Sequence, residues 1–496
     1  MVEETKQEKK APETPKTPVV VDEQLVETKH TITIGKREVK YTAAAGTLVL
    51  KEEDDEKGEH KPKASIFYTA YIADRPKGNK PRPLTFSFNG GPGSSSVWLH
   101  LGILGPRRVS MPSDASVPSP PFELLDNEYS VLDVTDLVFI DPVTTGFSRT
   151  VPGEEAKQFH GFQKDMELVA EFIRLFTTRH MRWTSPKFLI GESYGTTRAA
   201  ALSGHLQDRH GMYLNGIMLI SSILDFSTAI FNAGNELPYL LFLPTYAATA
   251  WYHRRLDEGL QKDLRKTLVE VEAFASNEYA LALMKGDTLG SEERNKIAEK
   301  LSRYTGLSRE YIERTNLRID ISRFTKELLR PQRKTVGRLD TRFISSDRDA
   351  AGEHYEFDPS YAAIQGPFTA ALNQYVRQEL NFKSDLPYEI LSGRVHPWSF
   401  KEHENQYVNV AETMRKALNQ NPALKVFVAN GYYDLATPYY ATAYTFNHLQ
   451  LEEHLRPNIS MEYYEAGHMM YIHRPSLVAQ KRHLADFIKK SSRTSS

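Results

Sequence analysis

The chain has 496 residues, of which 40% are hydrophobic and 25% are charged, as in an ordinary soluble globular protein. Its 62 Lys and Arg residues nearly balance its 63 Asp and Glu residues, and the net charge of -1 gives no reason to expect nucleic acid or an anionic membrane as a partner. The absence of cysteine excludes disulfides, thiolate metal sites, iron–sulfur clusters and a cysteine nucleophile.

Residues 1–28 are expected to form a disordered tail, because they combine Glu, Lys and Pro with few large apolar side chains. Their longest apolar run, residues 19–21, is shorter than the core of a secretory signal. The chain as given is therefore expected to be cytoplasmic, whereas removal of a signal would be compatible with a periplasmic or secreted protein.

A β-rich stretch is predicted next, and an alternation of strands and helices follows from about residue 82. Residues 31–34 and 66–71 alternate in polarity and predict the first strands. Short apolar runs predict buried strands, and apolar residues at helical spacing predict a helix over residues 162–176. The buried strands are expected at residues 84–88, 137–140, 188–190 and 217–220. This alternation predicts an α/β fold with a mostly parallel central sheet and helices on both faces.

The alternation then stops, and a long helical and highly charged segment is predicted as a cap inserted into the sheet domain. Ser291 and Ser308 are predicted N-caps within it, because acidic residues follow them in the first helical turn. Strand patterns resume at residues 426–428 and 459–463. The predicted parts are the tail, the first half of the core, the cap and the second half of the core: residues 1–28, 29–226, 227–398 and 399–496.

The motif Gly191-Glu192-Ser193-Tyr194-Gly195 is the first feature that carries chemistry. It follows a predicted strand and precedes a predicted helix, which is the context of a nucleophile elbow, where a sharp turn projects the serine hydroxyl into a cleft. The flanking glycines allow the strand and the helix to approach closely. The alternative is a glycine-rich turn in which the serine has no chemical role.

A serine nucleophile requires a base, and the base requires an acid that orients it. In hydrolases with such an elbow the three residues follow in the order Ser, Asp or Glu, His. Asp434 follows the late strand at residues 426–428, and His468 follows the last predicted strand. His448, in a helical pattern, and His473, beyond the loop, are less well placed competitors for the role of base.

The segment Asn89-Gly90-Gly91-Pro92-Gly93-Ser94-Ser95-Ser96 is a glycine-rich loop after an early predicted strand. It lacks the lysine and the spacing of a phosphate-binding loop, and it lacks the G-x-G-x-x-G pattern of a dinucleotide site. A loop in this position can instead supply a backbone N–H to an oxyanion. We expect the N–H groups of Gly91 and Tyr194 to form the oxyanion hole.

The sequence resembles the serine carboxypeptidase family, a branch of the α/β-hydrolases, and most of all its bacterial members. Five blocks in the family order carry the resemblance: NGGPGSSS (89–96), FIDPVTTGFS (139–148), GESYG (191–195), NGYYD (430–434) and AGHM (466–469). The resemblance implies the α/β-hydrolase fold and a serine-type carboxypeptidase that works through an acyl-enzyme intermediate. It also implies peptide substrates with a free C-terminal carboxylate and no metal or other cofactor.

The resemblance assigns a role to each matched residue. The catalytic triad, the oxyanion hole and the carboxylate-binding pair of the family match Ser193, Asp434 and His468, then Gly91 and Tyr194, then Asn89 and Glu192. Ser193 would be the nucleophile, His468 the general base, and Asp434 the residue that orients it. Glu192 can help to bind the substrate carboxylate only when it is protonated, because two carboxylates repel each other.

Three positions depart from the family pattern. The family usually has a Glu where this chain has Ile103, so the acidic pair that would share a proton with Glu192 is incomplete. Ser94 stands in place of a family Cys, and Arg149 in place of a Tyr. Because Ile103 replaces that Glu, the acidic pH preference of the family does not automatically carry over to this chain. The three residues of the triad are all present.

Two other classes of function compete with the peptidase. An esterase or acyltransferase on the same scaffold would keep the triad, but the pair of Asn89 and Glu192 favours the peptidase. A non-catalytic binding protein would need a broken triad, and each of the three residues is present. No motif indicates an oligomeric state or a preferred C-terminal side chain.

Overall fold

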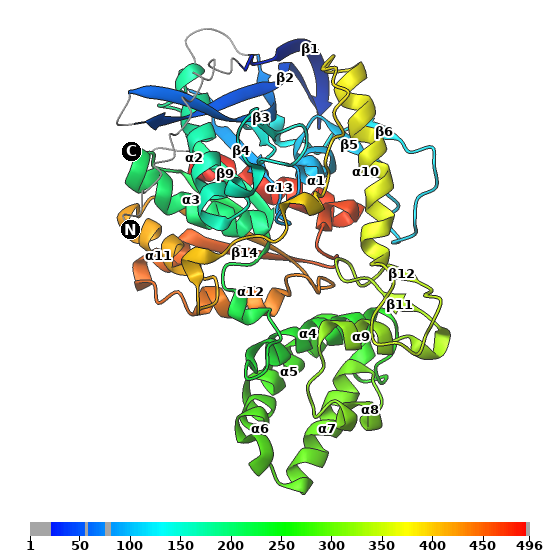
Figure 1. Ribbon diagram of the computed structural model, residues 1–496. Helices are drawn as coiled ribbons and strands as arrows, with labels where there is room; N and C mark the ends of the chain where they lie inside the picture. The colour runs from blue at the N-terminus through cyan, green and yellow to red at the C-terminus, as the bar shows by residue number, and fades with distance from the viewer. Residues whose placement is uncertain (1–20, 55–57, 75–80, 493–496) are drawn as a thin grey trace, which may run out of the picture.

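The computed structural model describes residues 21–54, 58–74 and 81–492, and ten strands within them form one central sheet (Figure 1). The strands lie in the order β1-β2-β3-β7-β4-β9-β10-β13-β14, with β8 paired to β3. The six strands β7, β4, β9, β10, β13 and β14 run parallel to one another. Strands β1, β2 and β3 each pair with their neighbours in the antiparallel direction. In that order their bounds are Leu25–Ile34, Arg37–Asp54, Glu59–Ala73, Asp136–Ile140, Leu84–Phe88, Lys187–Ser193, Gly216–Ser222, Lys425–Gly431 and Ile459–Tyr464, and β8 is Arg149–Thr150. The predicted α/β fold with a mostly parallel sheet is confirmed.

The sheet is buried on both faces, as the unbroken apolar runs of its parallel strands predict. In β9, Phe188 and Ile190 belong to the hydrophobic core on one face, and Leu189 belongs to the core on the other. The first core is completed by α1 (Val97–Leu99), α10 (Pro359–Gln378) and α13 (Arg474–Ser491). The second is completed by α2 (Phe162–Arg179), α3 (Tyr194–His210) and α11 (Ala411–Gln420).

The N-terminal edge of the sheet begins earlier in the chain than the sequence pattern indicates. Residues 1–20 of the expected tail lie outside the described residues, whereas β1 begins at Leu25, so residues 25–28 belong to the sheet. Strand β1 pairs with β2 without a break, from Leu25 opposite Gly46 to Ile34 opposite Arg37. Backbone pairing therefore orders this polar segment, which buries too few side chains to have been recognised as a strand.

Helices α4 to α9 form a separate bundle beyond one end of the sheet (Figure 1). Their bounds are Leu237–Tyr252, Leu264–Phe274, Ala280–Lys285, Ser291–Thr305, Arg309–Arg314 and Ile321–Glu327. The bundle has its own hydrophobic core, which reaches the sheet domain through Tyr432, Tyr433 and α12 (Tyr439–Asn447). Among the described helices, none is both long and apolar enough to cross a membrane.

The remainder of the insertion returns to the sheet. The short hairpin β11–β12 (Thr335–Val336, Ile344–Ser345) lies near the start of α10. A second hairpin from the first half of the core, β5–β6 (Arg107–Val109, Leu124–Asp126), lies toward the other end of α10, where Arg107 pairs with Glu379. Helix α10 then packs Ile364, Phe368 and Leu372 into the core of the sheet domain. We propose that the insertion expected over residues 227–398 has two parts, a helical bundle and a return segment that includes α10.

Candidate active site

Ser193 stands at the sharp turn between β9 and α3, where its backbone has φ 60° and ψ -131°. A non-glycine residue with positive φ is strained, at a cost on the order of 1–3 kcal/mol, and such strain gathers at functional positions. The turn is possible because its neighbours are glycines: a Cβ on Gly191 would lie 2.1 Å from the carbonyl oxygen of Gly195, and a Cβ on Gly195 would lie 2.8 Å from that of Phe88. The expected nucleophile therefore sits in the conformation that an elbow requires.

Asp434 and His468 form a buried hydrogen-bonded pair at the ends of neighbouring strands β13 and β14. His468 Nδ1 lies 2.7 Å from Asp434 Oδ2, and both side chains are at most 5% exposed. Oδ1 of Asp434 accepts the backbone N–H groups of Ala436 and Thr437 at 2.8 and 3.1 Å, and the Thr437 hydroxyl donates to Oδ2 at 2.7 Å. Burial lowers the pKa of His468, but the charge and hydrogen bond of Asp434 outweigh burial, so that the pKa is raised overall.

The competing histidines have other partners. His448 Nδ1 lies 2.7 Å from the backbone oxygen of Tyr444 at the end of α12, and His473 Nδ1 lies 2.8 Å from Ser476 Oγ at the start of α13. Neither histidine pairs with a buried carboxylate in the described part of the chain. The structure thus brings His468, and not His448 or His473, to the site.

A strap of five residues, 338–342, passes between the loops that carry Asp434 and His468. Three backbone hydrogen bonds fix it: Leu435 N to Arg338 O (3.0 Å), His468 N to Leu339 O (2.7 Å) and Thr341 N to Tyr433 O (3.0 Å). Within the strap, Asp340 forms a buried ion pair with Arg342 at 2.6 Å and also accepts the N–H of Gly467 at 3.2 Å. The strap therefore ties the two loops together, in addition to the direct backbone hydrogen bond from Tyr433 N to Ala466 O (3.0 Å), and no motif in the sequence marks it.

Glu192, the residue before Ser193, is fully buried and holds two hydrogen bonds. Asn89 Nδ2 donates to Glu192 Oε1 at 3.0 Å, and the Tyr471 hydroxyl donates to Oε2 at 2.6 Å. Burial raises the pKa of Glu192 to about 7, against the opposing effects of His468 and of these two donors. The structure thus joins the two residues that the sequence predicts for carboxylate binding.

Tyr471 is a residue of the site that sequence reasoning missed. Its ring lies against Gly102, where an added Cβ would come within 2.2 Å of it, and the neighbouring Ile103 is buried. The hydroxyl of Tyr471 thus partners Glu192 in a protein that has no Glu at position 103. The only sequence signal for Tyr471 is its position three residues after His468. The direction in which its hydroxyl points depends on the turn that follows that histidine, and the sequence does not reveal it.

The glycine-rich loop lies directly against the elbow. A Cβ on Gly90 would lie 2.4 Å from the backbone nitrogen of Tyr194, and Gly91 has φ 99°, a conformation that favours glycine. The N–H groups of Gly91 and Tyr194 donate to no other group in the described residues, so both are available to an oxyanion. On the far side, the loop is held by backbone hydrogen bonds to residues 390–392.

A pocket of about 460 Å³ lies over Ser193 and His468, and Asn89 and Glu192 line it as well. One wall consists of the glycine-rich loop with Leu391, Ser392, Gly393 and His396, and the other consists of Arg338, Leu339, Tyr355, Asp358, Tyr361 and Ile364. The site therefore combines a candidate nucleophile, an Asp–His pair and Glu192, a carboxyl group that can be protonated near neutral pH, around one cavity. An arrangement of this kind can carry out acyl transfer.

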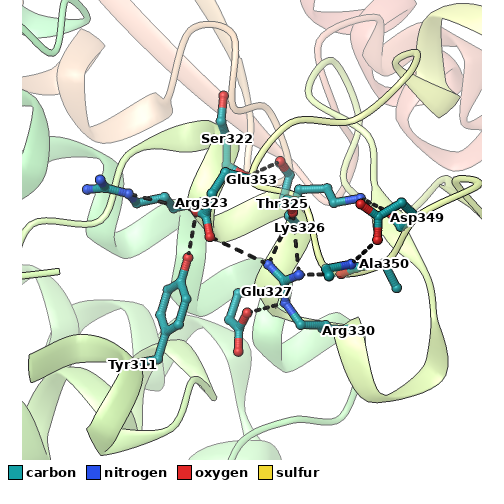
Figure 2. Close-up of polar contacts among 12 residues, drawn as sticks. Tyr311, Ser322, Arg323, Thr325, Lys326, Glu327, Arg330, Asp349, Ala350 and Glu353 are labelled. Carbon is teal, nitrogen blue, oxygen red and sulfur yellow. Dashed lines mark hydrogen bonds and ion pairs between the residues drawn. The ribbon is translucent and has the colours of Figure 1, made fainter. Parts of the chain in front are cut away.

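A polar network in the bundle holds the loop that leads to Tyr355 and Asp358 (Figure 2). Lys326 donates to the carbonyl of Asp349 at 3.1 Å, and Arg330 contacts the carbonyl of Ala350. Tyr311 donates to Glu353 at 3.2 Å. The second wall of the pocket is thus tied to α8 and α9.

Comparison with known proteins gives one family and one yeast relative. The serine carboxypeptidase family model matches residues 56–478. The pheromone-processing carboxypeptidase KEX1 of Saccharomyces cerevisiae, in strains JAY291 and S288c, is 33% identical over 157 residues, which are 30% of this chain and 20% of KEX1. The match thus spans about a fifth of the length of these curated relatives.

The crystal structure of KEX1(delta)p, a prohormone-processing carboxypeptidase from Saccharomyces cerevisiae, has the same fold. It superposes with a TM-score of 0.55 at 18% sequence identity and covers 91% of each chain.

Proposed function

Because the chain belongs to the serine carboxypeptidase family, we propose that it releases C-terminal amino acids from peptides through an acyl-enzyme intermediate. The observation that carries the proposal is the hydrogen-bonded pair of Asn89 and Glu192 in the pocket beside Ser193. The Tyr471 hydroxyl holds the other oxygen of Glu192 from outside that pocket. An exopeptidase must bind a terminal carboxylate next to the bond that it cleaves. A protonated carboxyl and an amide supply donors for that carboxylate at this place.

In the proposed reaction, Ser193 Oγ attacks the carbonyl carbon of the last peptide bond while His468 accepts the hydroxyl proton. The N–H groups of Gly91 and Tyr194 stabilise the oxyanion of the tetrahedral intermediate. His468 then gives its proton to the leaving amine, and the C-terminal amino acid departs. Water, deprotonated by His468, attacks the acyl-enzyme ester. His468 returns the proton to Ser193 Oγ as the ester bond breaks, and the shortened peptide leaves with a new C-terminal carboxyl group. Asp434 holds the imidazole in the tautomer that these transfers require.

An N-blocked dipeptide and its C-terminal amide test the proposal directly. A carboxypeptidase should hydrolyse the free acid much faster than the amide, whereas an esterase or acyltransferase has no need of the carboxylate. Labelling by a serine-directed fluorophosphonate, followed by mapping of the label to Ser193, would identify the nucleophile. Equal hydrolysis of acid and amide would contradict the proposal, even with Ser193 labelled.

The variant Glu192→Gln is expected to flatten the alkaline limb of the pH profile for peptides. Below its pKa of about 7, Glu192 is protonated and can donate to the substrate carboxylate; above it, the donor is lost and a like charge appears. The wild-type kcat/KM should therefore fall as the pH rises through about 7. A Gln amide donates at every pH. Esters without a carboxylate serve as the control and should change little, and an unchanged limb for peptides would favour the esterase.

Tyr471→Phe is expected to move the same alkaline limb to higher pH. The Tyr471 hydroxyl stabilises the ionised form of Glu192 and so lowers its pKa, and removing the hydroxyl should raise it. The measurement is the pH dependence of kcat/KM for one blocked dipeptide. Tyr246→Phe, which removes a buried hydroxyl from the helical bundle, is the matched control and should leave the limb in place. A shift to lower pH in Tyr471→Phe would contradict the assignment.

A further inference from the structure

Arg338 is the lining residue of the pocket that carries a permanent positive charge. Its backbone is held on two sides: its carbonyl accepts the N–H of Leu435 at 3.0 Å, and its own N–H donates to Asp358 Oδ1 at 3.1 Å. Leu435 follows Asp434, and Asp358 is the N-cap of α10. The backbone from which the Arg338 side chain extends is therefore held in place in the wall of the pocket.

The guanidinium of Arg338 makes no ion pair in the described part of the chain, although the side chain is partly buried. The more deeply buried Arg182, Arg198 and Arg342 all face a carboxylate within 3 Å. Asp358 lines the same wall, but its carboxylate accepts the backbone N–H groups of Arg338 and Ser360 and the Ser360 hydroxyl. Apart from a hydrogen bond with the Tyr355 side chain, the charge of Arg338 is thus left for a group that enters the pocket.

The charge of Arg338 affects the pKa values of two neighbouring side chains, Tyr355 and His468. Burial raises the pKa of the Tyr355 hydroxyl, and the nearby charge of Arg338 and a hydrogen bond between the two side chains oppose that rise. Arg338 likewise opposes the raised pKa of His468. Tyr355 and His468 line the same pocket as Arg338.

The wall with Arg338 is continuous with the proposed carboxylate-binding pair. The ring of Tyr361, on this wall, lies edge-on to that of Trp98 at 6.3 Å. The next residue, Leu99, donates its N–H to Asn89 Oδ1 at 3.2 Å. A substrate whose terminal carboxylate reaches Asn89 and Glu192 would thus direct its C-terminal side chain along this wall.

We propose that Arg338 makes the enzyme select peptides with an acidic C-terminal side chain, Asp or Glu. This inference rests on the proposed function, since it names the substrate class of the same site. A guanidinium pairs with a carboxylate through charge-assisted hydrogen bonds, and it repels a lysine or arginine side chain at the same place. Neighbouring Tyr355 and Tyr361 would contact the methylene groups of the acidic side chain.

The test compares three N-blocked alanyl dipeptides that end in Glu, Gln or Lys. At about pH 6 a side-chain Glu of the substrate is ionised, while Glu192, with a pKa of about 7, is still mostly protonated. We expect kcat/KM for Glu to exceed that for Gln by about tenfold, the size of one charge-assisted contact, and Lys to be poorest. Added salt should reduce the ratio of Glu to Gln.

Three variants assign the preference to Arg338. Arg338→Gln should bring the ratio of Glu to Gln close to one, and Arg338→Lys should keep part of it. Arg348→Gln removes an exposed charge from the loop that follows the strap and should leave the ratio unchanged. Retention of the wild-type far-UV circular dichroism and of Gln hydrolysis would show that the variants fold.

Several outcomes would overturn the inference. If the ratio of kcat/KM for Glu to that for Gln were near one in the wild type, or were unchanged in Arg338→Gln, Arg338 would not determine specificity. A preference for Glu at the penultimate residue alone, measured with dipeptides ending in alanine, would place the charge on the other side of the scissile bond. Failure of the proposed function would look different, because no C-terminal residue would then be released from any peptide.

Discussion

Replacing Ser193 by alanine should lower kcat/KM for a blocked dipeptide by about 10⁴-fold or more. In the proposed mechanism the hydroxyl is the attacking group, and without it only the oxyanion donors and substrate binding would remain to accelerate attack by water. The fold should be unaffected, because Ser193 makes no side-chain capping hydrogen bond to α3 and alanine has no larger side chain to place in the turn.

The measurement is the rate of amino-acid release by Ser193→Ala at an enzyme concentration high enough to detect a residual rate. Ser203→Ala, in the same helix α3 and buried, is the matched control and should retain activity. Thermal unfolding of both variants should resemble that of the wild type. Retention of more than a few per cent of wild-type activity by Ser193→Ala would exclude Ser193 as the nucleophile.

The second large effect is expected at the Asp–His pair. Asp434→Asn should reduce kcat/KM by roughly 10⁴-fold, and His468→Ala should reduce it further. The asparagine amide would donate to Nδ1 of His468 and stabilise the tautomer that carries its proton on Nε2, which cannot accept the proton of Ser193. Because Asp434 is the acid that contacts Nδ1 of His468, at 2.7 Å, this loss of activity is expected for substitution of Asp434 and not for substitution of other acids.

Rates of single-turnover acylation and of steady-state release together check this prediction, since His468 acts in both halves of the reaction. Asp385→Asn, at an exposed acid between α10 and α11, is the control and should behave as the wild type. If Asp434→Asn were as active as the wild type, the orienting role would pass to another acid, such as Asp358 or Asp385.

Sequence reasoning was most successful where a local pattern dictates geometry. The run of Phe188, Leu189 and Ile190 before a glycine identifies a strand buried on both faces, and the two glycines around Ser193 identify the turn. The order of Asp434 and His468 after late strands identifies their shared edge of the sheet. For the strand and the turn, the information lies in a short local stretch of the chain, whereas the Asp and the His were recognised from their order after Ser193.

The parts that escaped prediction depend on contacts between distant segments. The strap at residues 338–342 looks like any polar loop, and its role comes from lying between Tyr433 and His468. Tyr471 became part of the site only because Gly102 leaves room for its ring. Likewise β1 is ordered by its pairing with β2, which no local hydrophobic pattern reveals.

The strap also has a consequence for the time at which the enzyme becomes active during synthesis. The ribosome delivers Ser193 early and the strap later, but Asp434, His468 and Tyr471 come only after both. Until those late residues have emerged and packed around the strap, Ser193 has no base beside it. The proposed catalytic site can therefore assemble only after the chain has been synthesised at least as far as Tyr471.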